Sequence, residues 1–220
     1  MLQSFFNPDN AVWSFINKII DLVVLSLLFT LCCLPIVTIG PACTALYYTA
    51  VKCIRRHRSY SAKEFFSAFR TNLRKGIIIH LILSAFTAMM FVVDVPLILT
   101  FINTGKVGDT VLVIFMLLKA VLLLGMICWI YPVLSRFEQG ILKIGESALV
   151  LLVRCFPITI LCIVILLCAV LLIWLEPLLL AIVPGLAALL ISFPIEPVLR
   201  RICDADEVNA ESMDAWYLEK

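Results

Sequence analysis

Lys119 is the residue whose type and position point most directly to chemistry. It lies about nine residues into an apolar stretch that we expect to begin at Thr110, which places it ~14 Å along a helix, near the middle of a membrane. A charge at that depth costs at least ~2.5 kcal/mol and calls for a partner or a function. The preceding apolar stretch turns near Gly105, so Asp94 falls at a similar depth. We predict an intramembrane ion pair between Lys119 and Asp94.

This pair has two possible roles. It can fix the register of two neighbouring spans, or it can contact a solute or relay a proton. A relay usually needs several ionisable groups in file, and the other candidates, His80 and Glu176, belong near opposite membrane surfaces. The pattern therefore favours the structural role. The last apolar stretch is broken at Pro184-Gly185, Pro194 and Pro197, which is a pattern found in transporters but also in ordinary membrane helices.

Motifs for catalysis and for cofactor binding are missing from the sequence. It contains no G-x-S-x-G, H-E-x-x-H, Walker or G-x-G-x-x-G motif, and it has only two histidines. The nine cysteines include no C-x-x-C pair and lie mostly within apolar runs, so we expect small buried side chains rather than a disulfide framework or a zinc site. We predict no enzymatic activity, no cofactor and no metal.

Composition places the chain in a membrane. It is 63% hydrophobic and 15% charged, with a mean hydropathy of +1.12, against ~45–50% and ~25% for a soluble domain. We predict an all-α, polytopic transmembrane helix bundle in one domain, residues 1–203, followed by a polar cytoplasmic tail, residues 204–220. Five clear spans are expected at about residues 11–34, 76–100, 109–131, 155–175 and 177–199. A shorter helix is expected at about 41–57, and amphipathic helices at the cytoplasmic face at about 61–75 and 138–154.

Orientation follows from one basic segment, residues 52–75, which holds eight of the 17 lysines and arginines. Short loops rich in Lys and Arg stay in the cytoplasm, so we place this segment and both termini there. Its cations also suit a contact with anionic lipids. They are Lys52, Arg55, Arg56, Arg58, Lys63, Arg70, Arg74 and Lys75. We expect no nucleic acid, because the aromatic residues of the segment lie on an apolar helix stripe.

The helix at 41–57 is the uncertain element. It spans ~24 Å, less than the ~30 Å hydrocarbon layer, but its basic end can reach the headgroups. If it returns beside the first helix around a turn near Thr38, Asp21 comes level with Arg55, and we predict this pair. The alternative, that the helix does not cross fully, stays open.

The segment 61–75 carries a strong helix start signal. Ser61 and Glu64 form a capping-box pattern, and Phe65 and Phe69 share one apolar face. The same stripe suits a helix in the headgroup layer and a helix packed on its own protein; we favour the first. Further along, Glu196 precedes Arg200 by four residues, which suggests an ion pair at the membrane surface.

Several short segments resemble the YesL-like family of uncharacterised bacterial membrane proteins. They are FNPDN at 6–10, CCLPIVTIGP at 32–41, ALYY at 45–48, KEFF at 63–66 with Phe69, and YPVLSRF at 131–137. The loop RRHRS at 55–59 departs from the pattern, since family members often carry glycine and acidic residues there.

The resemblance implies a setting rather than an activity. Such proteins are encoded near binding-protein-dependent sugar importers, so it implies a bacterial plasma membrane and a role accessory to carbohydrate (ABC-type) uptake, with importer permease subunits as partners beside the lipid bilayer. The alternative is a small-solute transporter or channel that uses Lys119, Asp94 and the proline-broken last span.

Overall fold

The computed structural model describes residues 11–55, 60–104, 107–137 and 139–205, and within these ranges the ordered elements are all helical. The main helices are α1 (Ala11–Cys32), α2 (Ile39–Thr49), α3 (Ser61–Thr71), α4 (Leu73–Thr104), α5 (Val107–Arg136), α6 (Ile141–Arg154), α7 (Phe156–Leu175) and α8 (Val183–Ala205). Short helical turns join them: η2 (Ile36–Thr38), the π-helical η3 (Ala50–Arg55) and η4 (Pro177–Ala181).

Four segments of the described helices are long and apolar enough to cross a membrane. They are Leu73–Pro96, Val111–Arg136, Phe156–Leu175 and Val183–Ile202. In the most apolar stretch of each of the first three segments, only 11%, 17% and 22% of the residues are buried, so these stretches present a largely apolar surface. Such a surface is unsuited to water and suited to lipid, so these helices are consistent with a multi-pass membrane protein.

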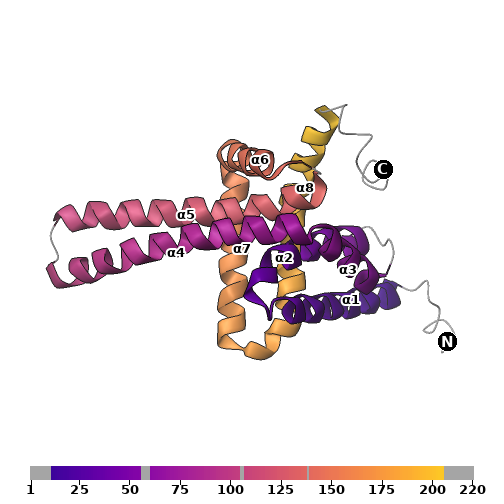
Figure 1. Cartoon of the computed structure of the whole chain (residues 1–220). Helices are drawn as coiled ribbons and strands as arrows, with labels where there is room; N and C mark the ends of the chain where they lie inside the picture. Colours follow the sequence, from indigo (N-terminus) through magenta and orange to yellow (C-terminus); the bar gives the residue numbers. More distant parts are fainter. Residues whose placement is uncertain (1–10, 56–59, 105–106, 138, 206–220) are drawn as a thin grey trace.

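The α4–α5 hairpin is the longest feature of the molecule (Figure 1). Both helices are longer than the sequence predicts, and α5 continues through Pro132 to Arg136 instead of ending at Tyr131. The proline does not end the helix because a membrane helix can satisfy the freed backbone group through its neighbours. The hairpin extends well beyond the other helices at its far end.

The arrangement of the remaining helices differs from the upright bundle that the sequence predicts. In Figure 1, α7 and α8 run crosswise to α4 and α5. The inner part of α5, from Leu124 to Arg136, packs on α2, α6 and α7 and reaches α8 through Arg136, whereas the outer part contacts α4. Among the described helices, contacts with the rest of the protein therefore hold the hairpin only at the end where α5 finishes, near Arg136.

The short helix α2 lies at the centre of the molecule. It contacts α1, α3, α4, α5 and α8, and most of its residues are buried. Gly40 crosses α4 at Gly76 so closely that a Cβ on Gly40 would lie 2.3 Å from the Gly76 carbonyl oxygen. Because protein rather than lipid surrounds α2, its length does not have to match the membrane.

Helix α3 packs on the protein through only part of its apolar face. Phe65 and Ala68 are buried against α1 and α2, whereas Phe66 is 48% exposed. The burial of Phe65 and Ala68 agrees with the alternative in which α3 packs on its own protein. Phe66 stays exposed and can contact lipid. The structure does not contain the predicted capping box: the helix begins at Ser61 itself, and no side chain caps it.

Candidate functional site

The structure brings Lys119 and Asp94 together across the α4–α5 hairpin. Lys119 Nζ lies 2.6 Å from Asp94 Oδ1, and each side chain is 19% exposed. The ammonium also lies 5.4 Å from the ring centre of Phe115, within cation–π range. The pair holds one register between the two helices, because a shift by one turn would separate the charges by ~5 Å.

The surroundings of this pair are unusual. Between residues 81 and 96 and between 111 and 123, Met116 is the only buried side chain. The exposed neighbours are large and apolar, among them Phe91, Val92, Leu117 and Leu118. A charge pair therefore lies on an otherwise apolar surface that other parts of the described chain do not cover.

A second charge pair lies deep in the protein, where sequence reasoning did not place one. Arg136 Nη2 is 3.0 Å from both Glu196 carboxylate oxygens, and these side chains are 3% and 2% exposed. The Tyr47 hydroxyl donates to Glu196 Oε2 at 3.3 Å. The cluster joins the inner ends of α5 and α8 to α2.

The predicted pairing of Glu196 with Arg200 is wrong, because Arg200 is exposed whereas Glu196 is buried. A sequence signal for the buried position existed. Glu196 continues the stripe of Ala188, Ser192, Ile195 and Leu199, which face the core at helical spacing. An acid on a buried stripe requires a cation from another helix.

The predicted pair between Asp21 and Arg55 is also not formed. Asp21 Oδ1 accepts a hydrogen bond from the Ser61 hydroxyl at 2.7 Å. Arg55 Nη1 donates instead to the Ser192 carbonyl oxygen at 2.9 Å, and its guanidinium stacks 4.8 Å from the Phe193 ring centre. The prediction counted α-helical turns, whereas η3 is π-helical, and the wider turn changes side-chain directions.

The predicted lipid-contacting cations separate into three groups. Lys52, Arg55 and Lys75 bond within the protein, the last to the Gln139 carbonyl oxygen. Three others, Lys63, Arg70 and Arg74, are exposed, and for these the lipid contact stays a prediction. Arg56 and Arg58 lie outside the described residues.

Lys52 has the most complete set of polar partners in this segment. Its ammonium donates to Glu64 Oε2 at 2.9 Å and to the Tyr48 hydroxyl at 3.1 Å, and it lies 5.2 Å from the Tyr48 ring centre. Burial lowers the pKa of Lys52, but the hydrogen bonds to Glu64 and Tyr48 outweigh it and raise the pKa above its ordinary value. Glu64, predicted as part of the helix cap, thus ties α3 to η3.

Comparison with known protein families finds a match for part of the chain. Residues 20–95 match the family model described as "Protein of unknown function, DUF624". No curated protein and no solved structure matches the chain.

The matched region covers most of α1, all of α2 and α3, and α4 as far as Val95. It therefore includes Asp94, Lys52 and Glu64 but neither Lys119 nor the Arg136–Glu196 pair. The description assigns no activity to that region. In the part of the chain that the structure describes, no three His, Cys, Asp or Glu side chains lie together as metal ligands.

Proposed function

We propose that this protein is a non-enzymatic component of the bacterial plasma membrane that works by binding the membrane helices of a partner. One observation carries the proposal: the outer half of the α4–α5 hairpin combines exposed apolar side chains with an ion pair and receives no cover from the other described helices.

Lipid can cover the apolar part of this surface, but it covers the ion pair poorly. A partly exposed charge pair in hydrocarbon loses its hydration and gains no new hydrogen bonds. A neighbouring helix that offers serine, threonine or asparagine can supply them, as polar groups commonly do between membrane helices. Lys119 and Asp94 are therefore the expected centre of the contact.

The partner that we propose is a permease subunit of a carbohydrate (ABC-type) importer, with this protein as its accessory. That choice depends on the resemblance to the YesL-like family, because the matched family model names no activity. We place the basic segment and both ends of the chain in the cytoplasm. The start of α1 and helix α3 lie on the side of the molecule away from the free end of the hairpin (Figure 1).

A transporter or channel is less well supported. Helix α8 continues without a break through Pro194 and Pro197, so it does not present the unwound backbone that binds ions in many transporters. Lys119 and Asp94 also do not line the cavity described below.

Site-specific photocrosslinking in native membranes tests the proposal. A benzophenone amino acid at Leu118, which is 55% exposed on the hairpin, is expected to crosslink to an importer permease subunit. The matched control is Leu142 on α6, which is 89% exposed and should give no such product.

Two results would contradict the proposal. One is crosslinking at Leu118 to lipid alone. The other is solute flux by the purified protein in liposomes that is lost in Lys119→Met, which would favour the transporter.

A further inference from the structure

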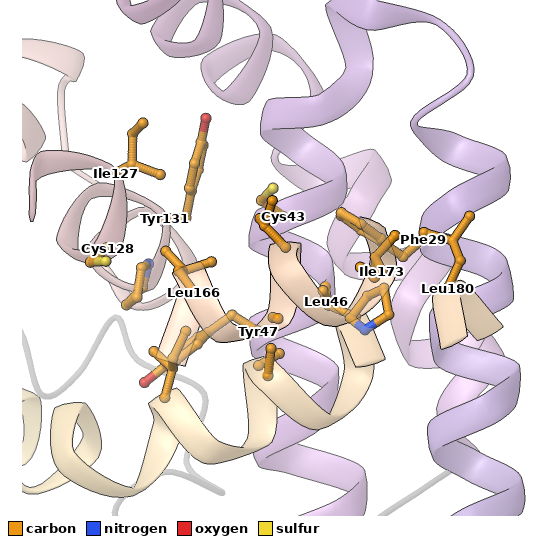
Figure 2. Close-up of a pocket in the computed structure, with 17 residues that line it drawn as sticks. Phe29, Cys43, Leu46, Tyr47, Ile127, Cys128, Tyr131, Leu166, Ile173 and Leu180 are labelled. Atoms are coloured by element: carbon orange, nitrogen blue, oxygen red, sulfur yellow. The ribbon is translucent and has the colours of Figure 1, made fainter. Parts of the chain in front are cut away.

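A cavity of about 290 Å³ lies between the hairpin base and the crosswise helices. Residues from α1, α2, α5, α7, η4 and α8 line it, and Figure 2 shows their side chains converging on it from these separate elements. Small side chains on two of the helices, Ala169, Ala187 and Ala188, leave the space open. The cavity therefore lies where six helical elements meet.

The lining offers very little to a polar molecule. None of its seventeen residues is charged. Its two phenol groups already have partners: the Tyr47 hydroxyl bonds Glu196, and the Tyr131 hydroxyl lies 3.3 Å from His80 Nδ1. A buried water usually needs two to four polar partners, and apolar cavities without them stay dry. Water is thus a poor occupant.

The cavity opens toward the surface of α7. Two lining residues are exposed, Val170 on α7 (62%) and Leu180 on η4 (37%). Their exposed neighbours on α7 are apolar, and α7 is one of the four helices suited to a membrane. The opening therefore lies on an apolar surface that is suited to contact with hydrocarbon.

We propose that the cavity binds one acyl chain of a membrane phospholipid. Its volume is roughly twice that of the ~150 Å³ apolar cavity that accepts benzene, which corresponds to a chain segment on the order of ten carbons. An empty apolar space loses dispersion contacts along its whole wall, and hydrocarbon is the material at its mouth. A partner helix, ~10 Å across, is too wide for it.

A photoreactive phospholipid tests the assignment. The protein is reconstituted in phosphatidylglycerol vesicles in which one acyl chain carries a diazirine near its end, and labelled peptides are identified by mass spectrometry. We expect labels on Cys128 and Ile191, which line the cavity and are 5% and 8% exposed. Lipid that only surrounds the protein cannot reach these two residues.

A variant at the mouth makes the test specific. Val170→Trp places a larger side chain at the entrance, so labelling of Cys128 and Ile191 is expected to fall about tenfold, which corresponds to ~1.4 kcal/mol. Val164→Trp is the matched control, since Val164 is 50% exposed on α7 but does not line the cavity. It should leave the labelling unchanged.

Three outcomes would overturn the inference. They are labels confined to exposed residues of α7, equal labelling of Cys128 in wild type and Val170→Trp, and labelling of Cys128 by a diazirine-bearing polyprenyl phosphate in preference to the phospholipid. Both variants alter an exposed position, so normal gel-filtration behaviour of each confirms that the fold is retained.

Discussion

Arg136 and Glu196 form an ion pair that is almost completely buried, with Arg136 Nη2 3.0 Å from each carboxylate oxygen. The pair joins α5 to α8 at the point where the hairpin meets the crosswise helices. Desolvation of two charges offsets much of their attraction, so such a pair adds little net stability. Its effect is on geometry, because any other packing of the two helices would leave a charge buried alone.

The first prediction concerns the loss of one partner. Arg136→Met leaves the Glu196 carboxylate buried without its cation, and we expect the free energy of unfolding to fall by ~3–5 kcal/mol. Adding Glu196→Leu should restore most of that loss, because the uncompensated charge is removed as well. Chemical unfolding in detergent, followed by circular dichroism, measures both changes.

Arg200→Met is the control for this prediction. Arg200 is exposed on the same helix as Glu196, so its replacement should change the free energy of unfolding by no more than ~0.5 kcal/mol. A double variant as unstable as Arg136→Met alone would show that the pair does not act as described.

A second prediction concerns the crossing of α2 and α4. Gly40→Ala would place a methyl group 2.3 Å from the Gly76 carbonyl oxygen and 2.7 Å from His80 Cβ. Backbone cannot move aside as a flexible side chain can, so the helices must separate. We expect a loss of at least ~1–3 kcal/mol in the free energy of unfolding.

Gly145→Ala on α6 is the control for this prediction, because it is not expected to lower the free energy of unfolding. A Cβ at Gly145 meets nothing within 4 Å, and alanine is a better helix former than glycine by ~1 kcal/mol. This variant should be as stable as wild type or more stable. A Gly40→Ala protein with unchanged stability would mean that the crossing is looser than the structure indicates.

The sequence alone predicted the features that depend on the length of an apolar stretch or on how far a residue lies from a turn. Apolar runs located α4, α5 and α7, and the depth of Asp94 relative to Lys119 followed from the turn between them. It did not predict that Pro132 would stay inside a helix. It also did not reveal the crosswise arrangement, because an apolar run does not show whether lipid or protein covers it.

The missed contacts have a common cause. Glu196 and Arg55 were assigned partners by counting residues along the chain or across one turn. Their actual partners lie on α5 and α8, and only the three-dimensional packing brings these together. For Ser61, the local cap competed with Asp21 of α1, and the contact with Asp21 is the one formed.

A third prediction concerns Lys119 and Asp94 as a unit. Asp94→Asn leaves the Lys119 ammonium on an apolar surface without its counter-ion, so the protein should lose stability. Adding Lys119→Met should restore part of it, with a coupling energy of ~0.5–3 kcal/mol. Thermal unfolding of wild type, Asp94→Asn, Lys119→Met and the double variant in one detergent gives the double-mutant cycle. Losses that simply add in the double variant would refute the pairing.

The last prediction uses the pH dependence of Lys52. Because its pKa is raised in the folded protein, Lys52 stabilises the fold at any pH below the ordinary lysine pKa of ~10.4. That contribution is lost as the pH rises through the folded-state value, when the ammonium is neutralised in both states. The melting temperature of wild type should therefore exceed that of Lys52→Met at about pH 8, and the difference should shrink toward pH ~11.

Lys63→Met separates this effect from the general loss of positive charge at high pH. Lys63 lies on α3 one residue before Glu64, but its side chain is exposed. Exposed lysines contribute little through ion pairs, so the difference between wild type and Lys63→Met should stay small and flat over the same pH range. A wild-type advantage over Lys52→Met that persists at high pH would mean that the methylene stem of Lys52, rather than its charge, holds η3 against α3.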